Sequence, residues 1–307
     1  MPGTWLIGTW LEGRAAYDRQ MDTEDPEELT AVSVPVRAEL PADARMGAVH
    51  LTVADLDRSL AYYETQIGLR VHARDGGRAQ LGTGGEDLLV LTEEPGAKPA
   101  DGYSGLFHFA LLVPERIDLA RWLAHAARDR VALSGLSDHY VSEAIYLRDP
   151  DHHGIEIYAD RPRELWEGQV GTRLTTLPLD TNDLLATLED PLSESVEGLA
   201  AGTVMGHVHL SVANVPQSID YYRDVVGFGL MAQLGDQAAF LSAGGYHHHL
   251  GANTWQSAGR PYAPEGYARL TQMTIVLPDQ AARDAVAEQL GGSEVLDPSG
   301  IPVTLAV

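Results

Sequence analysis

The sequence has no cysteine, and Lys98 is its only lysine among 307 residues. Without cysteine, disulfide bonds, thiolate metal sites and a cysteine nucleophile are all excluded. No apolar run approaches the length of a membrane span. The first 28 residues also lack the basic region and long apolar core of a secretory signal. We therefore expect a cytoplasmic protein with no membrane association, since a reducing compartment suits a chain without thiols.

Positive charge is scarce as well. The chain has 21 Lys and Arg against 44 Asp and Glu, which gives a formal net charge of −23. Such a surface repels phosphate backbones and anionic lipids, so we expect no nucleic-acid partner. Hydrophobic residues make up 44% of the chain, enough to form the core of one large domain or two ordinary ones.

An internal repeat organises the chain. Residues 48–71, "AVHLTVADLDRSLAYYETQIGLRV", align without gaps with residues 207–230, "HVHLSVANVPQSIDYYRDVVGFGL". Each copy opens with alternating apolar residues, which predicts a strand. An amphipathic helix follows in each copy and ends near Gly68 or Gly227.

A weaker partner follows each copy. Residues 106–127 and 270–290 align at Pro114 and Pro278, and both partners close on a strand after an Asp-Pro turn. We predict an α+β fold of four βαβββ modules, paired into two half-open mixed β-barrels with helices outside. The modules span about 46–95, 104–163, 204–258 and 268–307. Residues 1–45 are then an N-terminal extension, and 164–203 is a linker between 46–163 and 204–307 with a helix near 181–190.

A comparison of the copies separates structural from functional positions. His50 and His209 occur in both copies, which favours a structural role for this pair. By contrast, His207 aligns with Ala48, and His248 aligns with Leu88. His247 or His249 could be the active residue in place of His248, but strand alternation would place both on the face opposite to His248, so at most one face points inward.

The partner modules differ in the same way. His108 aligns with Gln272, and Glu156 aligns with Thr304. The segment with His139 and Tyr146 has no counterpart, because the fourth module is shorter. All the candidate site residues therefore fall in the second and third modules.

Two histidines and one carboxylate from three strands suit a facial triad for Fe(II) or Mn(II) with open positions. His108, His207 and Glu156 form the natural set. Around it, His248, His139 and Tyr146 are candidates for acid–base and hydrogen-bonding roles. An isolated histidine more often has a core or surface role, but the distribution of all six residues over the repeat favours a site.

Four segments carry a family resemblance. "HYVSEAIYLRDPDHHGIE" (139–156) resembles the signature of type I extradiol ring-cleavage dioxygenases in the vicinal oxygen chelate superfamily. Three further segments resemble the other active-site strands of that family: "FHFALLVP" (107–114), "GHVHLSV" (206–212) and "FLSAGGYHHHLG" (240–251). Over residues 46–307 the chain is most similar to the bacterial two-domain catechol-2,3-dioxygenases.

This resemblance implies an enzyme that opens a catechol with O2 at Fe(II), with Mn(II) as the alternative metal. It implies His108, His207 and Glu156 as metal ligands and His248 as the acid–base residue. Tyr146 would hydrogen-bond the metal-bound hydroxyl, and His139 would line the substrate pocket. Further substrate contacts are expected from Asn253, Trp255 and Tyr246. Open barrel edges favour a homodimer.

The chain also departs from the family. The family usually has Gly and Asn where this chain has His152 and His153, and we expect the turn "DPDHHG" to be exposed. The liganding modules are the second and third instead of the last two. We therefore predict that the second module pairs with the third and the first with the fourth. The rival pairing, first with second and third with fourth, would split the ligands unless two chains exchanged modules.

Two other functions remain open. One is another metalloenzyme of this superfamily, a glyoxalase-type isomerase or a lyase, which needs a metal and a base but no O2. The other is a non-catalytic small-molecule binding protein, which would have an apolar pocket and no metal. The polar residues His139 and Tyr146 favour the dioxygenase.

Overall fold

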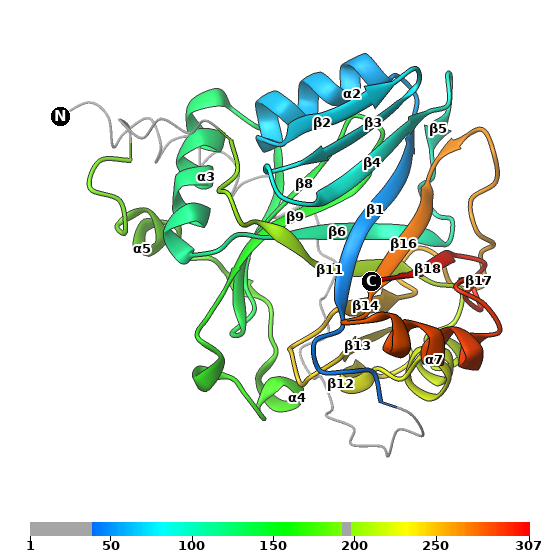
Figure 1. Cartoon of the computed structure of the whole chain (residues 1–307). Helices are drawn as coiled ribbons and strands as arrows, with labels where there is room; N and C mark the ends of the chain where they lie inside the picture. The colour runs from blue at the N-terminus through cyan, green and yellow to red at the C-terminus, as the bar shows by residue number, and fades with distance from the viewer. Residues whose placement is uncertain (1–38, 192–197) are drawn as a thin grey trace.

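The computed structural model describes residues 39–191 and 198–307 (Figure 1). The predicted extension over residues 1–45 therefore lies mostly outside the described residues, as does 192–197 of the predicted linker. Where the described chain begins, the Leu40 N–H donates to the carbonyl oxygen of Gly227 at 2.9 Å.

The larger sheet has nine strands in the order β10-β7-β8-β9-β6-β11-β14-β13-β12. Four of its strands come from residues 104–163, four from 204–258, and β10 from the linker. The two groups of four join where β6 pairs antiparallel with β11. The strands are β6 (Gly105–Leu112), β7 (Leu133–Asp138), β8 (Ser142–Arg148), β9 (Gly154–Asp160), β10 (Leu177–Pro178), β11 (Val204–Ser211), β12 (Gly229–Leu234), β13 (Ala238–Ser242) and β14 (Leu250–Asn253).

The smaller sheet has seven strands in the order β17-β18-β16-β1-β4-β3-β2 and joins antiparallel β1 to β16. Its strands are β1 (Arg45–Val53), β2 (Arg70–Asp75), β3 (Arg78–Gly82), β4 (Asp87–Glu93), β16 (Leu270–Val276), β17 (Glu294–Leu296) and β18 (Pro302–Ala306). The short strands β5 (Lys98–Pro99) and β15 (Tyr267–Ala268) pair separately. In the described chain the last module has two strands after its helix, so it is βαββ. The division of the chain into domains stays a prediction.

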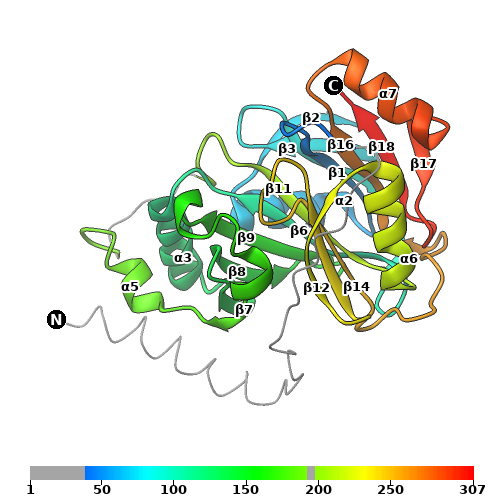
Figure 2. The same ribbon diagram turned by 90° about the horizontal axis from the view of Figure 1, so that it is seen from below.

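One helix follows the first strand of each module and lies on the outside of the sheets (Figure 2). Three of these helices begin with an N-cap side chain, from Asp55, Asn214 or Asp279. Gly68 and Gly227 end two of them in the left-handed region, with φ of 90° and 104°. The helices are α2 (Leu56–Tyr62) with the π-helical η2 (Tyr63–Ile67), α3 (Arg116–Asp129), α6 (Val215–Ile219) with η4 (Asp220–Val226), and α7 (Gln280–Leu290).

The linker adds η3 (Arg163–Leu165), α4 (Val170–Arg173) and α5 (Thr181–Leu185). The helix predicted near 181–190 is therefore present as α5, although it is shorter than expected. In the described chain, no helix is long and apolar enough to cross a membrane.

The two sheets share one apolar core. The buried cluster includes Val49 and Leu51 from β1 together with Val208 and Leu210 from β11, and β1 lies against β11 (Figure 1). Full burial of one such aliphatic side chain is worth about 1.5–3 kcal/mol. This shared core therefore holds the two sheets in a fixed relation.

The turn between β8 and β9 also joins the sheets. The Tyr63 hydroxyl donates to Asp149 Oδ2 at 2.8 Å, and Arg58 pairs with Asp151 at 2.6 Å. His153 Nε2 donates to the carbonyl oxygen of Thr52 at 2.9 Å. The clamp formed by Asp149, Asp151 and His153 therefore docks the second module onto the first.

The prediction that the "DPDHHG" turn is exposed is wrong for most of its residues. Asp149, Asp151 and His153 are at most 5% exposed, and only the His152 side chain faces solvent. The reason is that the turn docks on the first module. Carboxylates in Asp-Pro turns usually bind water, but here N–H and O–H donors of the first module take the place of that water.

Candidate metal centre

Three neighbouring strands bring His108, Glu156 and His207 together. Ala110, in the middle of β6, pairs with Glu156 of β9 on one side and with His207 of β11 on the other. His108 lies two residues before Ala110 and so shares its face of the sheet. The strand register therefore makes the three side chains converge.

The ligand atoms of this group lie close together. His108 Nε2 lies 3.0 Å from Glu156 Oε2, His207 Nε2 lies 3.1 Å from the same oxygen, and the two Nε2 atoms are 3.3 Å apart. Each of the three side chains is buried, with 6% exposure for His108, 2% for Glu156 and 1% for His207. Within the described chain these three form a group whose ligand atoms all fall within 4.8 Å.

The charge states of this group suit a cation. Burial opposes ionisation of Glu156, but His207 and His108 outweigh it and hold the Glu156 pKa well below its usual range. Burial lowers the pKa of His207 to about 4 even though the Glu156 carboxylate opposes this shift. Neutral imidazole nitrogens and an ionised carboxylate are the forms that bind a metal ion.

Tyr146 and His139 border the same group. Tyr146 of β8 pairs with Glu156 across the β8–β9 ladder, and its ring centroid lies 5.6 Å from that of His108. His139 Nδ1 lies 2.8 Å from the carbonyl oxygen of Thr175, which can only accept, so Nδ1 carries the hydrogen. In the neutral ring Nε2 then accepts from the Tyr146 hydroxyl at 2.7 Å.

His248 reaches the group from the loop between β13 and β14. Its ring centroid lies 4.1 Å from that of His207, and its side chain is 8% exposed. The expectation that His247 points away from His248 is wrong, because this segment is a turn and has no strand alternation. His247 is fully buried, and its Nδ1 lies 2.8 Å from His248 Nδ1.

Sequence reasoning named His247 only as a possible replacement for His248, and it missed the partner of His247, Asp160. His247 Nε2 lies 2.9 Å from Asp160 Oδ1 at the end of β9. Asp160 is four residues after Glu156, but nothing in the local pattern links it to the histidine run. His249, by contrast, accepts the Ala243 N–H at its Nδ1.

Aromatic rings line the next part of the sheet. Phe107 lies where the β6–β11 register shifts, and its ring centroid is 5.2 Å from both His209 and Trp255. The His209 ring packs on Gly251, where an added Cβ would come within 2.7 Å of it. His209 is buried, and its Nε2 has no hydrogen-bond partner among the described residues.

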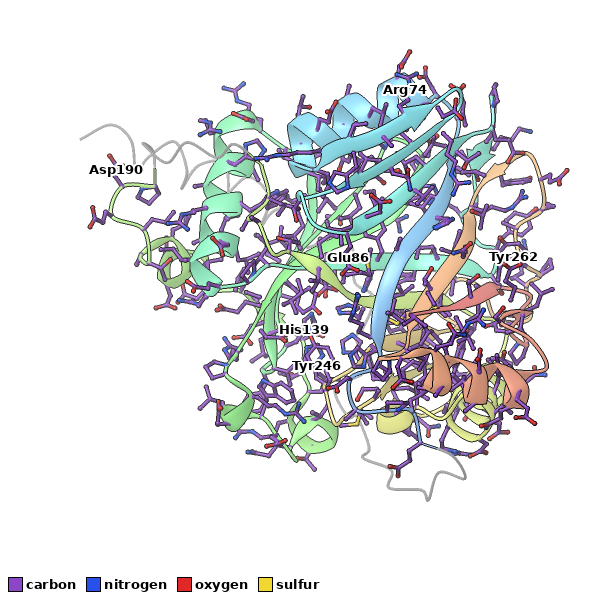
Figure 3. All side chains as sticks on the ribbon, in the orientation of Figure 1. Arg74, Glu86, His139, Asp190, Tyr246 and Tyr262 are labelled. Atoms are coloured by element: carbon purple, nitrogen blue, oxygen red, sulfur yellow. The ribbon has the colours of Figure 1, made fainter. Side chains whose placement is uncertain are left out.

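The expected substrate contacts fall in different settings. Trp255 is 42% exposed and belongs to this aromatic wall, whereas Asn253 is fully buried and accepts the Trp255 N–H at 3.2 Å. The Tyr246 hydroxyl lies 2.8 Å from that of Tyr158. Figure 3 shows Tyr246 and His139 below the crossing of β6 and β11.

Comparisons with known proteins agree with this architecture. The model of the Glyoxalase/Bleomycin resistance protein/Dioxygenase superfamily matches residues 45–157. A catechol-2,3-dioxygenase of Bacillus subtilis (strain 168) is 39% identical over 254 residues, which cover 81% of this chain and 88% of the relative.

Two solved structures show the same fold. A presumed dioxygenase of Bacillus subtilis aligns with a TM-score of 0.57 and 16% identity, over 88% of this chain and 86% of its own. Glyoxalase I of Zea mays aligns with a TM-score of 0.50 and 21% identity, over 86% and 92%. With the fold shared and the sequence 39% identical to a relative over most of both lengths, the chain belongs to the glyoxalase/bleomycin resistance protein/dioxygenase superfamily.

Proposed function

We propose that the protein is a metal-dependent extradiol dioxygenase that opens a catechol with O2. The observation that carries this proposal is the buried convergence of His108, Glu156 and His207 in a chain 39% identical to a catechol-2,3-dioxygenase. No feature of the described residues favours a glyoxalase-type isomerase, a lyase or a non-catalytic binding protein over it.

The donor set fits a divalent metal with open coordination positions. His108 Nε2, His207 Nε2 and one Glu156 oxygen would hold the ion, and two imidazoles with one carboxylate are the set preferred by Fe(II) in oxygenases. We propose Fe(II), with Mn(II) as the alternative. When bound, such a metal supplies a Lewis acid that acidifies a catechol hydroxyl and brings the substrate and O2 together.

The residues around the donor set would bind and orient the substrate. The Tyr146 hydroxyl donates its hydrogen bond to His139 Nε2, so the Tyr146 oxygen would act toward the substrate as an acceptor of a hydroxyl group. His248 lies beside His207 and would take the proton that the catechol loses. The rings of Phe107 and Trp255 would contact the aromatic ring and exclude water from one side.

Three finer features remain part of the proposal. We place the protein in aromatic catabolism, which follows from a catechol substrate. We also place it in the cytoplasm, since a reducing compartment suits a chain that lacks cysteine. We also propose a homodimer. The larger sheet supports this assembly because, among the described residues, β10 and β12 are its end strands and pair with no further strand.

Oxygen uptake tests the proposal directly. The metal-free protein is loaded with Fe(II) under anaerobic conditions, and catechol and air are then added. We expect O2 consumption and a coloured ring-fission product. H207A and E156A should lose both metal and activity, whereas H209A should only weaken metal retention. No O2 uptake by the loaded protein across a panel of catechols would contradict the proposal.

A further inference from the structure

A chain of hydrogen bonds leads to His248 from the side away from the candidate metal centre. Asp160 Oδ1 lies 2.9 Å from His247 Nε2, and His247 Nδ1 lies 2.8 Å from His248 Nδ1. His247 is fully buried, and the Asp160 side chain is 23% exposed. The three residues come from the end of β9 and the loop after β13.

The chemistry of the three groups sets the direction of these bonds. A carboxylate only accepts, so the hydrogen between Asp160 and His247 belongs to His247 Nε2. A neutral imidazole carries one N–H, so His247 Nδ1 is then an acceptor. The hydrogen between the two histidines must therefore come from His248 Nδ1, and His248 Nε2 is left with a lone pair.

Aromatic packing holds the His247 ring in this orientation. The Tyr246 ring lies 4.0 Å from it between centroids, and the Trp166 ring lies 5.5 Å from it. A flipped His247 ring would give up the bonds to both Asp160 and His248, and the ring nitrogens of the fully buried His247 would then lack a partner, which costs about 1–3 kcal/mol per unpaired polar group.

We propose that Asp160 and His247 are positioning residues that hold His248 in its Nδ1-protonated tautomer, with Nε2 presented as the acceptor of a substrate proton. This proposal rests on the proposed function for the identity of the substrate. Its structural part rests only on the hydrogen bonds of Asp160, His247 and His248.

Nitrogen NMR of the metal-free protein tests the tautomer without any turnover. With 15N-labelled histidine, and with H248Q used for assignment, we expect His248 to be protonated at Nδ1 and not at Nε2. D160A and H247L should shift His248 toward the other tautomer. His249 offers a matched control in the same loop, because H249N keeps an acceptor for the Ala243 N–H and should leave the His248 signals unchanged.

Steady-state kinetics tests the consequence for catalysis. H247L should lower kcat at saturating catechol roughly 10- to 100-fold, a loss typical of removing a residue that orients a functional histidine. KM and metal content should change less than about twofold, since in this proposal His247 contacts neither the substrate nor the metal ion. H247N places an amide oxygen near the position of Nδ1 and should recover part of kcat, whereas H249N should retain wild-type kcat.

The two experiments separate the two proposals. A His248 that is protonated at Nε2 in the wild type, or that is unchanged in H247L, would overturn the positioning role. An equal kcat for H247L and H249N would overturn it as well. Absence of turnover by the wild type on every catechol would contradict the proposed function, and the tautomer of His248 would still decide the role of Asp160 and His247.

Discussion

The two sheets carry different side chains at corresponding positions of their central strand pairs. In the larger sheet His209 pairs with His108 across β11 and β6, and in the smaller sheet His50 pairs with Gln272 across β1 and β16. The Gln272 amide donates to Thr274 Oγ1 at 3.1 Å and lies 3.4 Å from His50 Nε2. In the smaller sheet the Gln272 amide thus finds a hydroxyl partner, where the larger sheet has the His108 imidazole beside a second histidine and a carboxylate. The difference in chemistry therefore lies in a few substitutions on one repeated backbone.

Exchanging one residue between the sheets should have the largest effect. H108Q places the residue of the smaller sheet into the donor set, and we expect loss of metal retention and of O2 uptake, because an amide is a poor ligand for such an ion. Metal content after gel filtration and an oxygen electrode measure both. Q272H is the matched control and should change neither. A full metal content in H108Q would refute the assignment of His108 as a ligand.

The same comparison explains what the sequence could predict. A duplicated backbone makes His108, Glu156 and His207 visible as substitutions against Gln272, Thr304 and Ala48, and β-strand alternation then places them on one face. The four modules, the helix ends at glycine and the buried β9 follow from periodicity.

Features that depend on contacts between distant segments could not be predicted. His247 lies in a turn, where side-chain directions follow the packing of Asp160 and Tyr246 and no longer a strand period. The burial of Asp149 depends on Tyr63, which belongs to another module. The last module has two strands after its helix. The pairing of β18 with β16 and with β17 matches that of β9 with β6 and with β8, so the strand without a counterpart is β7.

The metal-free protein should lose stability in acid. Burial lowers the pKa of His207 to about 4, and burial together with Arg78 lowers that of His50 to about 4. Between pH 6.5 and 4 these histidines bind protons in the unfolded chain but remain neutral in the folded protein. The free energy of unfolding therefore falls as the pH falls. From pH 7 to 5, His207 alone contributes about 2 kcal/mol of this loss.

Urea unfolding in the presence of a chelator, at pH 7 and pH 5, measures this loss. H207Q and H50Q should each flatten the pH dependence to a similar extent, because the pKa of each histidine is lowered to about 4 in the folded protein. Parallel pH profiles for the wild type and H207Q would show that the protonation of His207 does not differ between the folded and unfolded states.

The clamps between modules permit a closer comparison. The Tyr63 hydroxyl donates to Asp149 at 2.8 Å, and in the same place on the other side of the repeat the Tyr222 hydroxyl donates to Asp297 at 3.0 Å. Y63F and Y222F should each lower the free energy of unfolding by about 1–3 kcal/mol, because each leaves a buried carboxylate short of one donor.

Urea denaturation of the single and double variants measures these clamps. The two losses should add, since the clamps share no partner. Y62F is the control, because the Tyr62 hydroxyl bonds an exposed carbonyl, that of Arg148, and its loss should cost less. A double variant much less stable than the sum would mean that the clamps act as one unit.

The smallest effect is expected at His152, an exposed residue in the turn between β8 and β9. Its φ of 72° places it in the left-handed region, which costs an L-residue about 1–2 kcal/mol and glycine almost nothing. H152G also gives up the hydrogen bond of His152 Nδ1 with Asp101 Oδ2 at 2.9 Å, which is worth little between two exposed side chains. After the greater entropy of an unfolded glycine is subtracted, we expect a net gain of about 0.5 kcal/mol.

The neighbouring histidine separates backbone strain from side-chain loss. H153G removes a buried ring whose Nε2 donates to the Thr52 carbonyl, and it should destabilise the protein by about 1–3 kcal/mol. D101A removes the partner of the His152 ring, together with the pair of Asp101 with Arg148 at 3.7 Å, and leaves the backbone as it is. If H152G were less stable than D101A, the His152 side chain would matter more than its left-handed backbone. The His152 side chain would then stabilise this turn by more than its left-handed backbone costs.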